Sequence, residues 1–128
     1  MTAEVFPLRG EIWLTDLNPI PGQSYDVPGE INKQRPALVV SADFVNKSRG
    51  GLALVLPITR TFRSIPAHII IKPNEGGIKE VSYIMCDQIR AISRTRLLER
   101  WGRITKPTMS KVAQSLLVIQ GLIGTSSQ

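Results

Sequence analysis

A series of short β-type segments that ends in one helical segment constrains the fold more than any other feature. After Pro107 the apolar residues follow the helical period, which predicts one amphipathic helix from 107 to about 122. Alternating or apolar runs bounded by turn residues predict strands at 10–16, 35–41, 52–58, 67–72, 82–90 and 100–104. The chain of 128 residues is therefore expected to be one domain, 1–128, with tails at 1–8 and 123–128. Its predicted class is mainly β with helices (α+β): a small antiparallel barrel covered by the C-terminal helix.

Local residue choices refine this prediction at three places. We expect Ser41 to cap a short helical turn over 42–47, and Ser93 to cap a turn that ends near Leu97. Pro57 should mark an edge or a bulge near the end of its strand, because proline has no N–H to donate to a ladder.

A long irregular stretch separates the first two predicted strands. Residues 19–34 contain three prolines and two glycines and show neither helical nor strand periodicity. Connections of this length in small domains are usually functional or mobile, so this loop is the first candidate for part of a site. Its one aromatic residue, Tyr25, is suited either to stacking on a base or to packing for stability.

The charge distribution favours a polyanionic partner. The formal net charge is +6, and residues 1–32 hold one basic and five acidic side chains, whereas residues 33–128 hold fifteen basic and five acidic ones. A basic surface of this kind attracts nucleic acid or an acidic protein segment.

Several kinds of chemistry are disfavoured by the residues present. Cys86 is the only cysteine and His68 the only histidine, so an internal disulfide, a zinc site and a nuclease with a histidine pair are not expected. His68 itself is expected on the surface of its strand. The carboxylates are scattered and no phosphate-binding glycine motif occurs, so neither a metal nor any other cofactor is predicted.

Membrane association and secretion are not expected. Residues 1–8 lack an apolar signal core, and the longest apolar run, 52–58, is far too short to span a bilayer. A cytoplasmic protein is the expectation.

Six segments occur in an order that resembles one known family. They are Gly10-Glu11-Ile12-Trp13, Asp16-Leu17-Asn18-Pro19, Gly22, Arg35-Pro36-Ala37-Leu38-Val39-Val40-Ser41, Pro57-Ile58-Thr59 and Cys86-Asp87-Gln88-Ile89-Arg90. From Arg9 to about Leu122 the chain is similar to the MazF/PemK/Kid toxins. The resemblance implies an SH3-like barrel of the CcdB/MazF/Kid type that forms a homodimer. It also implies an endoribonuclease of a toxin-antitoxin module that cleaves single-stranded RNA and is restrained by a cognate acidic antitoxin.

The resemblance also implies the site residues. By position, Arg35 matches the family's catalytic arginine, Thr59 its active-site threonine and Asp87 an acid assigned to catalysis or RNA binding. As RNA-binding residues we expect Gln23, Ser24, Tyr25, Arg60 and Gln88. Two positions depart from the pattern: the loop reads Gln23-Ser24-Tyr25 and is longer, and Met85 replaces an arginine that precedes the cysteine-aspartate pair in the Kid-like branch.

The implied reaction is attack of a ribose 2′-hydroxyl on the adjacent phosphate, which selects RNA over DNA because DNA lacks that hydroxyl. A guanidinium suits this step because it stays charged and donates two hydrogen bonds to the phosphate. The general base is left open among Asp87, Asp26, Glu30 and a water molecule.

Other interpretations remain at this point. Arg35 could be a charged strand entry, Thr59 an ordinary strand residue, and Asp87 a structural partner of Arg90 or Arg60. For the whole protein, the alternatives are a CcdB-like gyrase poison without enzymatic activity and a barrel that binds RNA without cutting it.

Overall fold

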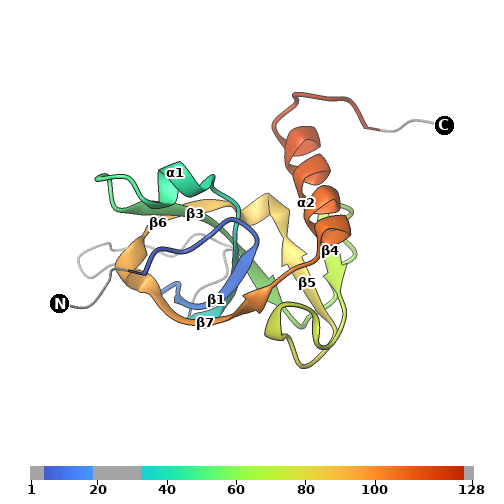
Figure 1. Cartoon of the computed structure of the whole chain (residues 1–128). Coiled ribbons are helices and arrows are strands. Elements are labelled where there is room, and N and C mark those ends of the chain that lie inside the picture. Colours follow the sequence, from blue (N-terminus) through green and yellow to red (C-terminus); the bar gives the residue numbers. More distant parts are fainter. Residues whose placement is uncertain (1–4, 19–32, 126–128) are drawn as a thin grey trace.

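The computed structural model describes residues 5–18 and 33–125, and in this part of the chain antiparallel strands hold more residues than helices do (Figure 1). The strands are β1 Glu11–Asp16, β2 Gln34–Val39, β3 Leu52–Thr59, β4 His68–Ile71, β5 Ser82–Met85, β6 Arg90–Ser93 and β7 Leu97–Arg103. The helical elements are α1 Asp43–Asn46, α2 Lys106–Ile119 and the 3₁₀ turns η1 Glu75–Gly77, η2 Cys86–Gln88 and η3 Arg94–Arg96. The mainly β prediction with a C-terminal helix is confirmed.

The strands form one sheet that curves without closing into a complete barrel. Its order is β4-β5-β3-β2-β1-β7, and β6 pairs with β3 beside this path. The turn η1, which lies between β4 and β5 in the chain, packs on β7 at the edge of the sheet. Gly77 has φ +82°, and a Cβ atom there would lie 2.5 Å from the carbonyl oxygen of Trp101, so this close approach requires glycine.

Two prolines mark the point where β3 changes partners. The β2–β3 ladder ends at the pair Ala37 and Pro57, and Pro36 precedes it on β2. Neither proline has an N–H to donate, which fits the end of a ladder. Beyond Pro57, β3 pairs with β5 instead, through Ile58 with Ile84 and Thr59 with Tyr83. The predicted role of Pro57 as an edge or bulge residue thus corresponds to this change of partner.

Helix α2 covers one side of β3, β4 and β5. Val112 and Leu116 of the helix are buried in a core cluster with Ile58, Ile71 and Ile84 of the strands. Figure 1 shows α2 standing beside β4 and β5, away from α1. We call this side of the three strands the α2 face. The opposite side, which carries the alternate residues of the same strands, is called the Thr59 face.

The C-terminal helix is shorter than predicted. It ends at Ile119 and not near residue 122, and Gly121 follows with φ +74°. Leu117 and Ile119, two of the apolar residues in this segment, are 39% and 41% exposed. Thr105 caps the helix by accepting a hydrogen bond from the backbone N–H of Thr108.

Two further local predictions were wrong and one was right. The segment predicted as one strand from 82 to 90 is split by η2 into β5 and β6, because the chain turns at Cys86 to leave β5 and join the other end of β3. Ser41 does not cap α1; its hydroxyl contacts the buried Asn46 side chain and accepts from the N–H of Leu54, 2.9 Å away. Ser93 caps η3, as predicted, by accepting from the N–H of Thr95.

Within residues 5–18 and 33–125, no helix has the length and apolar character needed to cross a bilayer.

Candidate active site

Arg35 and Thr59 lie on neighbouring strands, two residues beyond the last pair of the β2–β3 ladder. Alternation along β2 places Arg35 on the same side as Ala37 and Val39. Alternation along β3 places Thr59 on the same side as Val55, which belongs with Ala37 and Val39 to one core cluster. The two residues therefore share one face of the sheet, the Thr59 face.

The Thr59 hydroxyl is fixed by its surroundings. Thr59 is only 2% exposed, and its Oγ1 accepts a hydrogen bond of 3.1 Å from the backbone N–H of Thr61. Because a hydroxyl can accept and donate at the same time, the Thr59 O–H can still donate to another group.

Two aromatic rings lie next to Thr59. Tyr83 is the β5 partner of Thr59, and its ring centroid lies 5.6 Å from that of Phe62 at an interplanar angle of 56°. Phe62 is 67% exposed. An exposed ring packed on a second ring is a rigid apolar surface at this end of β3.

Asp87 is held by a histidine from the neighbouring strand. His68 begins β4, and its Nε2 atom lies 2.8 Å from Oδ1 of Asp87 in η2. The His68 side chain is 4% exposed, so the prediction of a strand-surface histidine was wrong. The Asp87 side chain is 37% exposed and remains accessible to solvent.

The other predicted RNA-binding residues are placed differently. Arg60 is exposed and pairs with Glu80 at 3.1 Å, not with Asp87. Gln88 follows Asp87 in η2 and is half-buried. Gln23, Ser24 and Tyr25, together with the candidate bases Asp26 and Glu30, lie outside the described residues.

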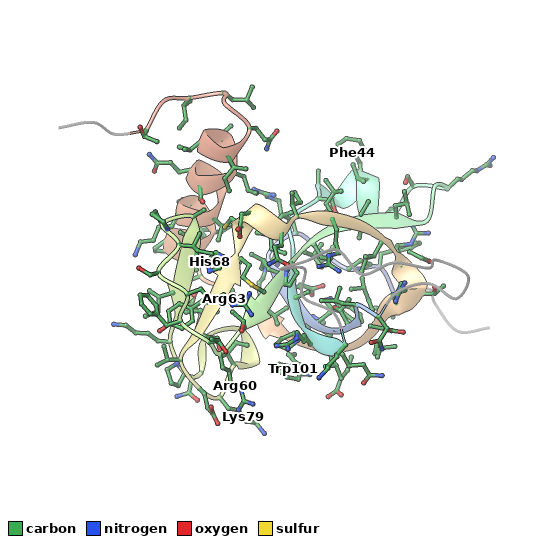
Figure 2. The ribbon with its side chains drawn as sticks, turned by 180° about the vertical axis from the view of Figure 1, so that it is seen from behind. Phe44, Arg60, Arg63, His68, Lys79 and Trp101 are labelled. Carbon is green, nitrogen blue, oxygen red and sulfur yellow. The ribbon has the colours of Figure 1, made fainter. Side chains whose placement is uncertain are left out.

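A basic pocket of about 780 Å³ opens between the start of β2, the end of β3 and the middle of β7. Five of its lining residues are basic and two are acidic: Lys33, Arg35, Arg60, Lys79, Arg100, Glu80 and Glu99. Figure 2 shows Arg60 and Lys79 near each other at the lower edge of the molecule. The excess of cations suits an anionic ligand.

The pocket does not contain the whole set of candidate residues. Arg35 contributes to its wall, but Thr59, His68 and Asp87 do not. Ile58 and Arg60 line the pocket, and alternation along β3 sends Thr59 to the other side of the strand. By strand alternation Arg35 and Thr59 share the Thr59 face, while Asp87 contacts His68 of β4. Arg35 and Arg60 both line the pocket.

A buried carboxylate contacts the part of β7 that lines the pocket. Glu11 is 3% exposed, and it contacts the Arg100 guanidinium and accepts from Nε1 of Trp13 at 3.1 Å. These contacts hold the Arg100 side chain at the pocket.

The strand ends that lead into the predicted loop are tied together. The N–H of Leu17 donates to the carbonyl of Lys33 at 2.9 Å, and Arg96 donates to the carbonyl of Asp16 at 2.7 Å. A hydrogen bond from the backbone N–H of Asn18, helped by Arg96, lowers the pKa of Asp16. Arg35 therefore lies next to a strand end that these hydrogen bonds hold in place.

Neither a metal cluster nor a reactive thiol is found in the part of the chain that the structure describes. No group of three or more histidine, cysteine, aspartate or glutamate side chains there could hold a metal ion. Burial raises the pKa of the Cys86 thiol to about 11.

Two parts of this site could not be found by periodicity along the chain. The pairing of His68 with Asp87 joins residues nineteen positions apart, and strand alternation alone assigned His68 to the surface. Tyr83 and Phe62 carried a visible signal, since both are aromatic residues near the Thr59 segment, but only the pairing of β3 with β5 brings Tyr83 beside Thr59.

Comparison with known proteins bears on this arrangement. A family model described as PemK-like, MazF-like toxin of type II toxin-antitoxin system matches residues 8–119. The chain is 32% identical to endoribonuclease MazF9 of Mycobacterium tuberculosis over 113 residues, which cover 84% of this chain and 91% of that protein. It is 30% identical to endoribonuclease EndoA of Bacillus subtilis over 117 residues, which cover 90% and 95% of the two chains.

The fold also matches solved structures. One is an endoribonuclease in complex with its cognate antitoxin from a mycobacterial species, with a TM-score of 0.71, 24% identity and coverage of 92% of this chain and 98% of that one. The matched residues 8–119 include every strand described above. The chain therefore belongs to the PemK-like, MazF-like toxin family of type II toxin-antitoxin systems.

Proposed function

We propose that this protein is the toxin of a toxin-antitoxin module and an endoribonuclease that cleaves single-stranded RNA at the Thr59 face. The observation that carries the proposal is the placement of Arg35 and Thr59 on one face of neighbouring strands. Asp87 contacts His68, which alternation along β4 places on the same face. The names of the two curated relatives support the activity. Cleavage of messenger RNA in the cytoplasm would stop translation and growth.

The proposed reaction needs one nucleophile, one cation and one base. The ribose 2′-oxygen forms a bond to phosphorus while the bond to the 5′-oxygen breaks, which leaves a cyclic phosphate and a free 5′-hydroxyl. The Arg35 guanidinium donates hydrogen bonds to phosphate oxygens, whose negative charge grows in the transition state. The Thr59 hydroxyl donates to one of the same oxygens.

Asp87 is the proposed acceptor of the 2′-hydroxyl proton. Its carboxylate is partly exposed and one of its oxygens is held by His68. A carboxylate within hydrogen-bond reach of the hydroxyl can act as a general base, whereas an arginine is too basic to do so. Gln88, the next residue, is proposed to contact the RNA on the same side.

The proposed path of the RNA includes both sides of the end of β3. The basic pocket with Arg60 would bind a flanking phosphate, because its lining carries an excess of positive charge. Gln23, Ser24 and Tyr25 are proposed to contact the bases, and this remains a prediction from the sequence.

Two protein partners are proposed. The first is an acidic antitoxin, supported by the solved complex of a structurally similar endoribonuclease with its cognate antitoxin and by the basic charge of residues 33–128. The second is another copy of this chain, because apolar side chains at the end of α2 are exposed and suited to burial: Leu117 at 39%, Ile119 at 41% and Leu122 at 65%.

The experiment is cleavage of a long single-stranded RNA by the purified protein, with mapping of the 5′ ends of the products. Arg35→Ala should lower the cleavage rate about a hundredfold or more, because one preorganised donor to the transition state is lost. Arg49→Ala is the matched control, since Arg49 is exposed and lies outside the pocket lining. Both variants should keep the thermal midpoint of the wild type.

Three outcomes separate the alternatives. Discrete RNA fragments with a 5′-hydroxyl, formed also in excess EDTA, support the proposal. A mobility shift without cleavage would instead indicate an RNA-binding barrel, and an effect that requires gyrase would indicate a gyrase poison. The gyrase poison is not favoured, because the curated relatives described above are named endoribonucleases.

A further inference from the structure

His68 and Asp87 form a pair that the proposed reaction uses only in part. The Nε2 atom of His68 lies 2.8 Å from Oδ1 of Asp87, and the histidine side chain is almost completely buried at 4% exposure. The aspartate is much more accessible, at 37%. The His68 side chain is therefore buried, whereas the Asp87 side chain is accessible to solvent.

The buried histidine is poorly suited to a purely structural role. Within residues 5–18 and 33–125, its Nδ1 atom is the one buried side-chain nitrogen or oxygen that has no hydrogen-bond partner. An ionised carboxylate only accepts hydrogen bonds, so Nε2 carries the proton toward Asp87 and Nδ1 is left without compensation for its lost hydration. An apolar side chain of similar size would pack at this position without that cost. Groups of this kind in native structures call for an explanation, and a functional role is a common one.

The register of β4 and β5 shows where the pair acts. His68 lies opposite Met85, and Ile70, two residues further on the same side of β4, lies opposite Tyr83. Tyr83 in turn lies opposite Thr59. The side chain of His68 is thus on the Thr59 face, two strands from Thr59, while Ile69 and Ile71 point to the α2 face.

Met85 explains why the hydrogen-bond donor to the Asp87 carboxylate comes from β4. It comes two residues before Asp87 and is fully buried at the end of β5. A methionine cannot donate a hydrogen bond to the nearby carboxylate, so β5 itself provides no side-chain donor at this position. The histidine directly across the ladder from Met85 supplies that donor instead.

We propose that His68 is a positioning residue that fixes the Asp87 carboxylate for proton transfer, an inference that rests on the proposed function. Nε2–H holds Oδ1, so Oδ2 stays directed toward the substrate and accepts the proton of the ribose 2′-hydroxyl. As that O–H bond breaks, the 2′-oxygen bonds to phosphorus and the bond to the 5′-oxygen breaks. The leaving oxygen takes a proton from a solvent water, and the hydroxide that forms takes the proton from Asp87, which restores the carboxylate.

The test compares three variants with the wild type in RNA cleavage at saturating and limiting RNA. His68→Phe removes the donor and keeps a ring, His68→Gln restores an N–H donor, and Asp87→Asn removes the proposed base. Lys72→Ala is the control for a change beside β4, because Lys72 is exposed and directly follows that strand. Thermal midpoints are measured for all proteins.

The expected pattern separates positioning from structural support. His68→Phe should lower kcat by about tenfold to a hundredfold with KM changed less than about threefold, since misplacement of a reacting group acts on the chemical step. Its thermal midpoint should equal or exceed that of the wild type, because the unpartnered Nδ1 atom is gone. His68→Gln should recover part of kcat, and Lys72→Ala should behave as the wild type.

A double-mutant comparison completes the test. In the Asp87→Asn background, His68→Phe should lower kcat no further, because the two residues act as one unit. Wild-type kcat in His68→Phe, a loss of kcat that only follows a lower thermal midpoint, or full additivity in the double variant would each overturn the inference. If the wild type cuts RNA and Arg35→Ala does not, any of these three outcomes rejects only the role of His68 and leaves the proposed function in place. If the wild type does not cut RNA, the proposed function and this inference are both wrong.

Discussion

The α2 face and the Thr59 face of β3, β4 and β5 differ in what their buried residues do. On the α2 face, Ile58, Ile71 and Ile84 meet Val112 and Leu116 of the helix in a continuous apolar core. On the Thr59 face, the same three strands bury a threonine hydroxyl and an imidazole. Alternation along each strand keeps these two sets of residues apart.

The difference indicates that the buried residues of the two faces have different roles. Apolar burial on the α2 face contributes stability in proportion to the area removed from water. Polar burial on the Thr59 face contributes little net stability and fixes the direction of hydrogen bonds. We therefore expect substitutions of the buried apolar residues on the α2 face to act on folding, and substitutions of the buried polar residues on the Thr59 face to act on RNA cleavage. The following predictions are given from the largest free-energy effect to the smallest.

Leu56→Ala should have the largest effect, and it should be on stability. Leu56 is fully buried in the cluster of the α2 face. Its truncation leaves a cavity and should lower the free energy of unfolding by about 2 to 5 kcal/mol. Urea denaturation followed by circular dichroism measures this loss. Cleavage per folded molecule should remain near the wild-type value, and a selective loss of activity would contradict the division between the faces.

Thr59→Val should lower RNA cleavage strongly and stability only slightly. The substitution preserves shape but removes the hydroxyl, so cleavage should fall about a hundredfold, equivalent to about 2.7 kcal/mol in the transition state. Stability should fall by only about 1 kcal/mol, because the N–H of Thr61 loses its acceptor. Single-turnover cleavage and urea denaturation measure the two quantities. Thr59→Ser, which keeps the hydroxyl, is the control and should retain most activity.

Glu75→Gln should have a smaller effect that depends on pH. Partial burial raises the pKa of Glu75, but hydrogen bonds from Thr108 and Thr105 more than offset this, and the net pKa is lowered. The ionised form is thus favoured in the folded state. It stabilises the start of α2 above the ordinary glutamate pKa, and this contribution disappears as the pH falls through the lowered value.

The expected difference in unfolding free energy between wild type and Glu75→Gln is about 1 kcal/mol at pH 7 and close to zero at pH 2. Thermal unfolding at the two pH values measures it. An equal difference at both values would mean that the carboxylate charge does not stabilise the helix start.

Arg60→Ala should have the smallest effect on stability. The ion pair with Glu80 joins side chains that are 73% and 65% exposed, and such pairs contribute about 0 to 1 kcal/mol. RNA binding should weaken and become less dependent on salt, because one phosphate contact is lost. Binding of a 2′-deoxy-substituted RNA at two salt concentrations measures this. An unchanged salt dependence would place the RNA away from the pocket.

Local periodicity was enough to predict most of the elements. The β-type runs 10–16, 35–41 and 52–58 correspond to β1, β2 and β3, and the period after Pro107 corresponds to α2. These predictions succeed because a strand or an amphipathic helix shows its buried side at a fixed spacing. The end of α2 and the break between β5 and β6 were missed because they depend on which neighbour the chain packs against.

For the site, the sequence by itself determined the residue types, their order and the family that they resemble. That resemblance selects Arg35, Thr59 and Asp87, and their types suit a phosphodiester reaction, which needs a cation, a hydroxyl and a base. Only the tertiary structure decided that β3 leaves β2 at Pro57 to pair with β5, and that His68 of β4 holds Asp87. Alternation within one strand says which side a residue takes, but the pairing of distant strands decides which side is buried and what lies there.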